Sequence, residues 1–264
     1  MASAFLPSRR LTIMAAALAV AAFAAPASAQ RQPTVIKGAG DVAPLIGQYR
    51  HLLGEPNNGN AAGPLALGRR EINWDGVPDD KAAPNFLPGD FFKGRGAMLS
   101  TPGQGVQVSA KETNPTNTPP RFGHINPSYA RIFKAYSGER LFSPVGSRFV
   151  DLTFVVPGTD IPAAVKGFGA VYVDTDLPHT SFQYFDAHGR SLGKFPVPAM
   201  NEGFTFLGVL YDGPVVARVR IEYGTTALGP DDDPKKKKDV SVMDDFIFGE
   251  PQAIGSATVA ARRR

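Results

Sequence analysis

Apolar and polar positions alternate along much of the chain from about residue 70 onward. From Ala217 to Tyr223 every second residue is apolar, and the residues between are Arg218, Arg220 and Glu222. The segment from Arg148 to Val156 shows the same period of two. Because successive side chains of a strand point to opposite faces, we expect each segment to form a strand with one buried face and one wet face.

Further short segments rich in β-branched and aromatic residues lie between clusters of Gly, Pro, Asn and Asp. They predict strands over Ile72–Trp74, Val106–Ser109, Ile132–Tyr136, Phe168–Asp174, Ser181–Asp186, Phe204–Tyr211 and Val240–Phe248. The turns at 186–189 and 211–214 suit antiparallel pairing rather than βαβ units. No repeat of fixed period is visible, which disfavours a propeller or solenoid. We therefore expect an all-β protein with an antiparallel jelly-roll-like β-sandwich, a barrel being the alternative, and a long loop over 114–127.

A helical pattern precedes the predicted strands. Apolar residues recur at three-and-four spacing, at Val42, Leu45, Ile46, Tyr49, Leu52 and Leu53. Asp41 is placed to cap this short N-terminal helix and Gly54 to end it, whereas residues 30–40 are expected to lack regular structure. The predicted organisation is a lead-in, short helix and loop over 30–68, a β-sandwich domain over 69–250, and a flexible basic tail over 251–264.

The first 29 residues have the pattern of an export signal. Arg9 and Arg10 precede an apolar run from Leu11 to Ala25, and Ala27-Ser28-Ala29 supplies a small-residue cleavage site. The run is shorter than the roughly 20 residues that span a bilayer, which disfavours a membrane anchor. Paired arginines also occur in twin-arginine signals, so two export routes stay open. We expect a protein that is exported to the periplasm or the extracellular space, without a membrane partner after cleavage.

Charge and cysteine content restrict the function classes. Two of the 28 Lys and Arg residues lie in the signal, four form Lys235–Lys238 and three form Arg262–Arg264, which leaves 19 against 24 acidic residues. The body of the chain is therefore acidic, and a nucleic-acid partner is not expected. The segment Asp231–Lys238 is interpreted as a solvated hairpin tip. The absence of cysteine excludes thiolate zinc sites and iron–sulfur clusters.

Several carboxylates are candidate metal ligands. Asp244 shares its strand parity with apolar neighbours and is expected to face the core, and Asp245 the opposite face. A buried carboxylate must be paired, protonated or bound to metal. Asp75 and Asp79, with Asp80, lie in a loop near the first predicted strand of the sandwich and offer further oxygens. These residues predict a structural calcium site; the alternative is that Asp244 meets an arginine or a backbone amide.

Two other features have a structural and a functional interpretation. Asp174 and Asp176, followed by His179, form either a polar turn, which we favour, or an acid/base or cation site at the end of a strand. Trp74, the only tryptophan, either caps the end of the sandwich, which we favour, or forms a platform for sugar stacking. No Gly-x-x-x-x-Gly-Lys or His-Glu-x-x-His motif is present.

Three segments carry a resemblance to a known group: Gly68–Pro78, Gly167–Asp174 and Val242–Gly249. The chain resembles uncharacterised exported bacterial β-sandwich proteins, many of which carry a PEP-CTERM sorting tail. The resemblance implies an exported sandwich and brings no activity with it. After Gly249 the sequence shows neither a Pro-Glu-Pro signal nor an apolar tail, so surface anchoring is not expected.

These patterns together favour a non-catalytic exported β-sandwich that binds a glycan or another extracellular ligand, with a possible structural calcium. The alternatives are a secreted hydrolase with a noncontiguous active site and a structural envelope or matrix protein.

Overall fold

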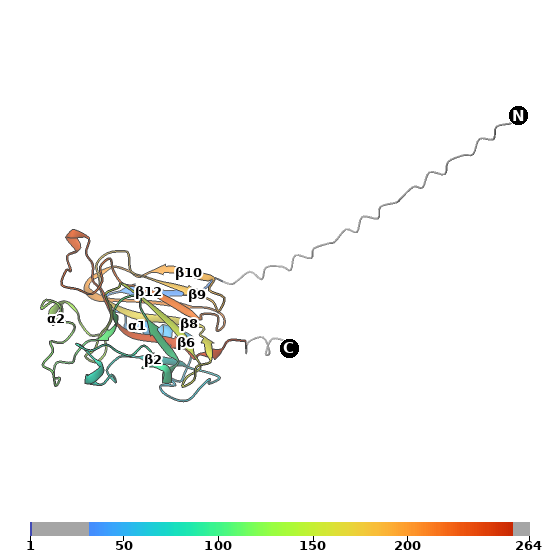
Figure 1. Cartoon of the computed structure of the whole chain (residues 1–264), viewed down its shortest axis with the longest axis horizontal. Coiled ribbons are helices and arrows are strands. Elements are labelled where there is room, and N and C mark those ends of the chain that lie inside the picture. Colours follow the sequence, from blue (N-terminus) through green and yellow to red (C-terminus); the bar gives the residue numbers. More distant parts are fainter. Residues whose placement is uncertain (2–31, 256–264) are drawn as a thin grey trace. The chain divides into compact units, whose positions relative to one another are not determined.

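The architecture, in a computed structural model, is a sandwich of two antiparallel sheets (Figure 1). The structure describes Met1 and residues 32–255; the predicted signal and most of the predicted tail lie outside the described residues. The first sheet has the order β1-β11-β8-β13-β5-β4, with β2 also pairing with β13. Its strands are β1 (Thr34–Ala39), β2 (Arg69–Ile72), β4 (Gly105–Val108), β5 (Phe142–Val145), β8 (Gly167–Thr175), β11 (Met200–Leu210) and β13 (Val242–Gly249).

The second sheet has the order β10-β9-β12-β6-β7-β14, with β3 pairing with β6. Its strands are β3 (Ala97–Ser100), β6 (Phe149–Val155), β7 (Pro162–Ala164), β9 (Ser181–Phe185), β10 (Ser191–Pro196), β12 (Arg218–Glu222) and β14 (Gln252–Ala253). The helices are α1 (Ala43–Leu53) and α2 (Tyr129–Ile132), with 3-10 turns at Asp79–Lys81, Lys93–Arg95 and Pro234–Lys236. The predicted all-β antiparallel sandwich with a short N-terminal helix is confirmed.

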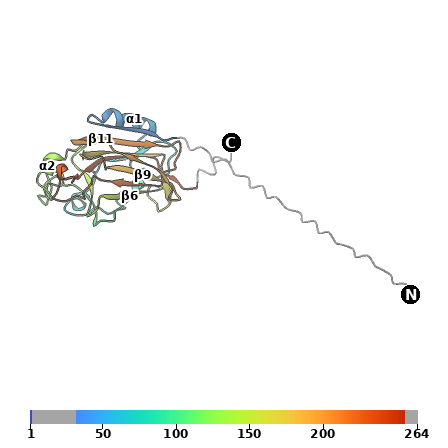
Figure 2. The same cartoon turned by 90° about the horizontal axis from the view of Figure 1, so that it is seen from above.

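The two sheets differ in how many faces they bury. Alternate residues of β6 are buried and half-buried, as the period of two predicts. All residues of β8 and β13 are buried instead, because their inner faces contribute to the core between the sheets and their outer faces are covered by other elements. Figure 2 shows α1 lying over the outer face of the first sheet, where it packs with β1, β11 and β13.

Helix α1 approaches the sheet closely through Tyr49. The Tyr49 hydroxyl donates a hydrogen bond to the carbonyl of Val209 at 3.0 Å, and its ring lies over Gly169 and Gly208. A Cβ atom at Gly208 would lie 2.7 Å from the Tyr49 ring. These glycines therefore provide the space that the helix needs to dock.

The helix prediction is confirmed in extent, and Gly54 ends the helix as expected. Asp41 stands one residue before the N-cap Val42, and its carboxylate accepts the N–H of Ala43 at 3.2 Å. Two other expectations are wrong. Residues 34–39 form β1 rather than an unstructured lead-in, because they pair along their length with β11. The predicted strand over Ile132–Tyr136 is instead the end of α2 and a coil.

The physical reason for the second error is local. Asn126 accepts hydrogen bonds from the N–H and the hydroxyl of Ser128, which fixes the turn that begins α2. One helical turn then brings Tyr129 against Phe133, with ring centroids 4.4 Å apart. The apolar residues of this segment pack at helical spacing, which a short pattern does not distinguish from a strand.

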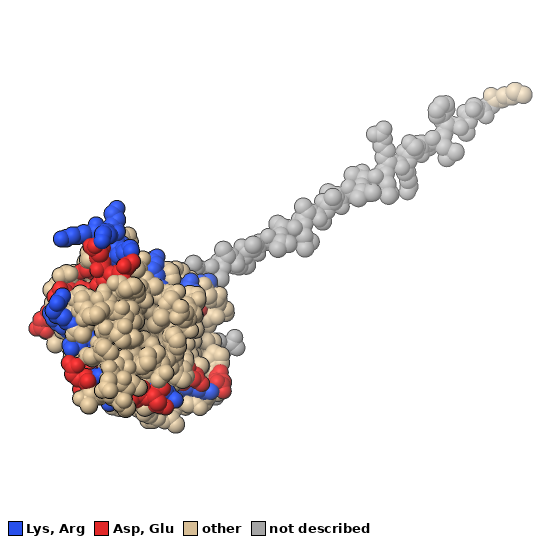
Figure 3. Space-filling view, turned by 60° about the vertical axis from the view of Figure 1, so that its left-hand side comes forward, with Lys and Arg blue, Asp and Glu red and all other residues tan. Residues whose placement is uncertain are grey.

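The segment Asp231–Lys238 projects from one end of the molecule, where Figure 3 shows basic side chains above a group of acidic ones. An antiparallel bridge joins Asp233 to Lys238 across a 3-10 turn. The segment connects β12 of one sheet to β13 of the other. It is thus a solvated tip on a crossing between sheets, and not a hairpin between two paired strands.

The docking of α1 yields a prediction about stability. We expect Gly208→Ala to lower the free energy of unfolding by roughly 1–3 kcal/mol, because the added methyl group meets the Tyr49 ring in a packed layer. Gly213→Ala is the matched control, since a Cβ there meets nothing within 4 Å. Urea unfolding of the two variants measures the difference; equal stability of both would contradict this account of helix docking.

Candidate functional site

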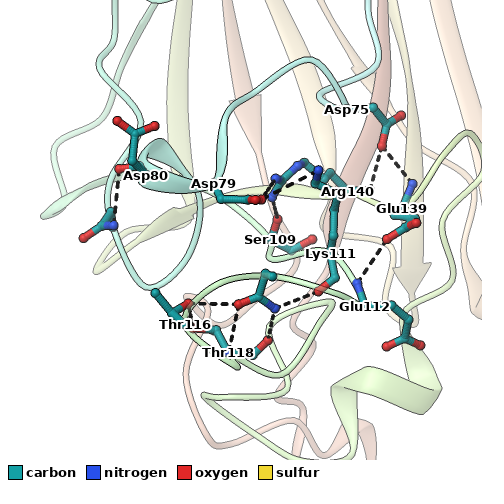
Figure 4. A network of polar contacts seen from close by, with 12 residues as sticks. Asp75, Asp79, Asp80, Ser109, Lys111, Glu112, Thr116, Thr118, Glu139 and Arg140 are labelled. Carbon is teal, nitrogen blue, oxygen red and sulfur yellow. Dashed lines mark hydrogen bonds and ion pairs between the residues drawn. The ribbon is translucent and has the colours of Figure 1, made fainter.

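The predicted calcium ligands Asp75 and Asp79 lie close to the same loop segment (Figure 4). Asp75 Oδ1 accepts the N–H groups of Glu139 at 2.8 Å and of Arg140 at 3.2 Å. Asp79 pairs with the buried guanidinium of Arg140, while Asp80 contacts Lys81 at the surface. The Arg140 side chain also donates to the carbonyl of Ser109 at 2.7 Å. The two loop aspartates therefore hold residues 139–140 in place.

Asp244 and Asp245 lie at a β-bulge in β13. Met243 pairs with Tyr172 and Phe246 with Ala170, so the two aspartates together oppose one residue of β8. Asp244 is buried as predicted, with 0% exposure, but its carboxylate faces the loop at Tyr136 and Ser137 rather than the core between the sheets. The prediction of opposite faces is wrong, because both carboxylates contact the hydroxyl of Ser137. The bulge turns two consecutive side chains toward one loop.

The bulge carboxylates form an acid pair. Asp244 Oδ2 accepts the N–H of Tyr136 at 2.6 Å and of Ser137 at 3.2 Å. Burial raises the pKa of Asp244 well above its ordinary value, and the neighbouring charge of Asp245 raises it further. Burial also raises the pKa of Asp245. A proton shared between the two carboxyl groups relieves their repulsion.

The four predicted ligands are therefore not gathered around one point. Asp75 and Asp244 bind opposite ends of the segment 136–140, and Asp79 is paired with arginine. Among residues 32–255, one group of acidic side chains lies close enough together to hold a metal ion. None of the four predicted ligands belongs to that group. Calcium binding at Asp75, Asp79, Asp244 and Asp245 stays a prediction.

The convergent group consists of Asp174, Asp176 and Asp232, with one carboxylate oxygen of each lying within 4.8 Å of the others. Asp174 is the second-last residue of β8 and has a left-handed conformation, φ 62°; its Oδ1 accepts the N–H of Glu202 at 2.7 Å. Asp232 comes from the tip between β12 and β13, and its Oδ1 accepts the N–H of Val240 at 3.2 Å. His179, which follows the pair in sequence, is exposed and outside the group.

Asp239 adds a fourth negative group beside the three. Its Oδ2 accepts the N–H of Leu177 at 2.9 Å. Burial, together with the charges of Asp176, Asp232 and Asp239, raises the pKa of Asp174 to about 7. Burial likewise raises the pKa of Asp232 and of Asp239 to about 6 each. The four carboxyl groups thus repel one another in a poorly hydrated place; we name them the acidic cluster.

A separate pocket of about 370 Å³ lies where β2 ends. It is lined by Asn60, Asn73, Trp74, Gly76, Phe91, Phe92, Gly94 and Arg95. Arg95 donates from Nε to Asn60 Oδ1 at 2.8 Å and from Nη1 to the carbonyl of Glu71, and it lies over the Phe92 ring at 5.6 Å. Within the described chain the exposed carboxamide of Asn73 forms no hydrogen bond. We name this site the asparagine pocket.

Trp74 lines this pocket but is only 1% exposed. Its ring stacks on Phe142 with centroids 4.2 Å apart, and its indole N–H donates to the carbonyl of Asp244 at 2.8 Å. Trp74 therefore caps the core, as favoured from the sequence, and offers little ring surface to a sugar.

The sequence also contains a Gly-x-Ser-x-Gly pattern, Gly189–Gly193, which is typical of hydrolase nucleophile turns. Here it forms the turn into the edge strand β10 rather than a strand-to-helix turn. Ser191 Oγ accepts the N–H of Gly193 at 3.3 Å and lies 3.4 Å from Gln183 Nε2. No histidine among the described residues hydrogen-bonds to it, so the pattern lacks the contacts of a nucleophile.

No protein-family model matches the chain, and no curated protein matches it. Among solved structures, it is similar to a glycoside hydrolase family 43 arabinoxylan arabinofuranohydrolase from Bacillus subtilis in complex with cellotetraose, with 16% identity over 44% of this chain and a TM-score of 0.28. The match spans 23% of that enzyme. It is also similar to TmCBM61 in complex with β-1,4-galactotriose, with 16% identity, a TM-score of 0.28, and coverage of 61% of this chain and 89% of that one.

A third match, to a family 29 carbohydrate-binding module, has 11% identity and a TM-score of 0.24, and covers 44% of this chain and 72% of that one. No helix among the described residues has the length and apolar character needed to cross a membrane.

The acid pair yields a prediction with two matched variants. Asp244→Asn keeps an oxygen acceptor for the N–H groups of Tyr136 and Ser137, so we expect the free energy of unfolding near pH 4, where the carboxyl group of Asp244 is protonated in the folded state, to change by less than about 1 kcal/mol. Asp244→Ala leaves those donors without this acceptor and is expected to cost roughly 1–3 kcal/mol. Urea unfolding measures both. Equal losses in the two variants would contradict the acceptor role.

A second prediction concerns pH. Because the pKa of Asp244 is raised in the folded state, the folded protein retains a proton that the unfolded chain releases above about pH 4. The stabilisation from this proton is present below that pH and is lost as the pH rises toward the folded-state pKa. We expect urea unfolding of the Asp244→Asn variant to lack this part of the decline. An unchanged pH slope would show that Asp244 is ionised when folded.

Proposed function

We propose that the protein is an exported, non-catalytic β-sandwich that binds a glycan in the asparagine pocket. The observation that carries the proposal is the unused carboxamide of Asn73, which lies in a pocket together with aromatic rings and the guanidinium of Arg95. Sugar hydroxyls need such fixed donors and acceptors, while the apolar faces of a sugar pack on aromatic rings.

The geometry of Arg95 supports this use of the pocket. Its guanidinium is held by Asn60, by the carbonyl of Glu71 and by the Phe92 ring, so its direction is fixed before a ligand arrives. A donor that is already ordered loses less conformational entropy when a ligand binds. Phe91 is half-buried, and it offers apolar surface at the same place.

The N-terminal run of basic, apolar and small residues supports the export part of the proposal. The contacts of Ser191 support the non-catalytic part, since they lack a partner base.

The proposal predicts saturable binding of the purified protein to a subset of an array of neutral and acidic glycans. Asn73→Ala is expected to weaken the binding of a selected glycan about 10-fold in calorimetry, the effect of one lost hydrogen bond of about 1.4 kcal/mol. Asn201→Ala, an exposed asparagine outside the pocket, is the control.

Uniform blanks on the array would reject glycan binding, and equal affinity of the Asn73→Ala variant would reject the asparagine pocket as the site. Turnover of any array sugar would instead favour the hydrolase alternative.

A further inference from the structure

The acidic cluster lies where two chain segments cross from one sheet to the other. The segment 176–180 leads from β8 in the first sheet to β9 in the second, and the segment 223–241 leads from β12 in the second sheet back to β13 in the first. Asp174 lies next to the end of β8, Asp176 begins the first crossing, and Asp232 and Asp239 belong to the second. The cluster is outside the asparagine pocket and has no role in the proposed glycan site.

Three consecutive aspartates of the tip have different surroundings. Asp231 pairs with Lys238 at 2.6 Å, and Asp233 pairs with Lys236 at 2.9 Å. Asp232, between them, is half-buried and contributes an oxygen to the convergent group. No ion pair connects a lysine or arginine of the described residues to Asp174, Asp176, Asp232 or Asp239. The lysines beside the cluster therefore do not neutralise it.

Asp239 provides an independent observation. It is 0% exposed, and its Oδ1 has no hydrogen-bond partner although the atom is buried. Asp176 Oδ1 is likewise buried and without a partner. The charge of Asp239 raises the pKa of Asp174 and of Asp232, so its carboxylate lies close to the convergent group. Buried carboxylate oxygens without partners are costly unless a ligand satisfies them.

From this geometry we propose that Asp174, Asp176 and Asp232 bind one calcium ion, with Asp239 as a fourth acidic group beside it. Calcium–oxygen distances of about 2.3–2.6 Å place two ligands of one ion up to roughly 5 Å apart. The 4.8 Å limit among the three carboxylate oxygens fits that span. The remaining positions are filled by backbone carbonyls or water, as calcium tolerates six to eight oxygens in flexible geometry.

The ion would join the two crossings at this end of the sandwich. Without it, the acidic groups of the β8–β9 and β12–β13 connections repel one another. With it, the carboxylates of both crossings share one positive centre. Calcium would thus stabilise the folded state by binding it and not the unfolded chain.

The test measures the thermal midpoint of the purified protein in EDTA and in calcium, together with the luminescence of bound terbium as a direct probe of the ion. At calcium about 100-fold above its dissociation constant, we expect the midpoint to rise by roughly 5–10 °C. Asp232→Asn and Asp176→Asn are expected to lose most of this rise and of the terbium signal. In EDTA both variants should melt no lower than the wild type, because the substitution removes repulsion.

Asp231→Asn is the matched control, since its carboxylate lies in the same run but pairs with Lys238 at the surface. It should keep the full response to calcium. Absence of a calcium shift and of terbium binding in the wild type would overturn the proposal. So would an undiminished shift in the Asp232→Asn variant, which would place the ion elsewhere, or an equal shift with magnesium, which would exclude a calcium-selective site.

Discussion

The burial of both faces of β8 and β13 is the constraint on which the rest of the structure depends. The second sheet covers one face, and α1 with neighbouring loops covers the other. A strand covered on both faces has no wet side for polar residues, so each polar group at its ends or irregularities must find a partner inside the protein. The acid pair at the bulge of β13 and the acidic cluster at the end of β8 are two results of this constraint.

The same requirement explains why the loops are ordered. The buried Arg70 of β2 forms a bidentate pair with Glu250 at 2.7 Å, and it donates to the carbonyls of Gly59 and Ala61. Glu250 in turn accepts hydrogen bonds from the loop at Asn58 and Leu65. Removing one member of such a pair leaves the other charged and buried. The loops are thus fixed by the polar groups of the central strands, and the asparagine pocket has a rigid wall as a consequence.

Sequence patterns predicted the elements that bury one face, because the period of their apolar residues shows which side chains that face contains. The alternation in β6 and β12 and the stripe of α1 follow from one buried face each. Asp244 is buried as predicted, but because both faces of β13 are covered and not because of its parity. The bulge at Asp244 and Asp245 was not predictable, because it depends on pairing with β8. The proximity of Asp174 and Asp232 was not predictable for a similar reason. The two residues are separated by 57 residues of chain, and only the crossings between the sheets bring their carboxylates together. The sequence of β1 has no strong alternation of apolar and polar residues. It forms a strand because it pairs with the edge of the sheet at β11.

The bulge in β13 also has a consequence for how the length of this strand can vary. Met243 faces the inner core on one side of the bulge, and Phe246 and Phe248 face it on the other, although 243 and 246 have opposite parity. Deleting one of the two aspartates would leave a regular strand with the same residues inside, whereas a deletion elsewhere in β13 would exchange its faces. A chain one residue shorter at this point would keep the whole hydrophobic core and lose only the acid pair, so the strand can change length here without a change of fold.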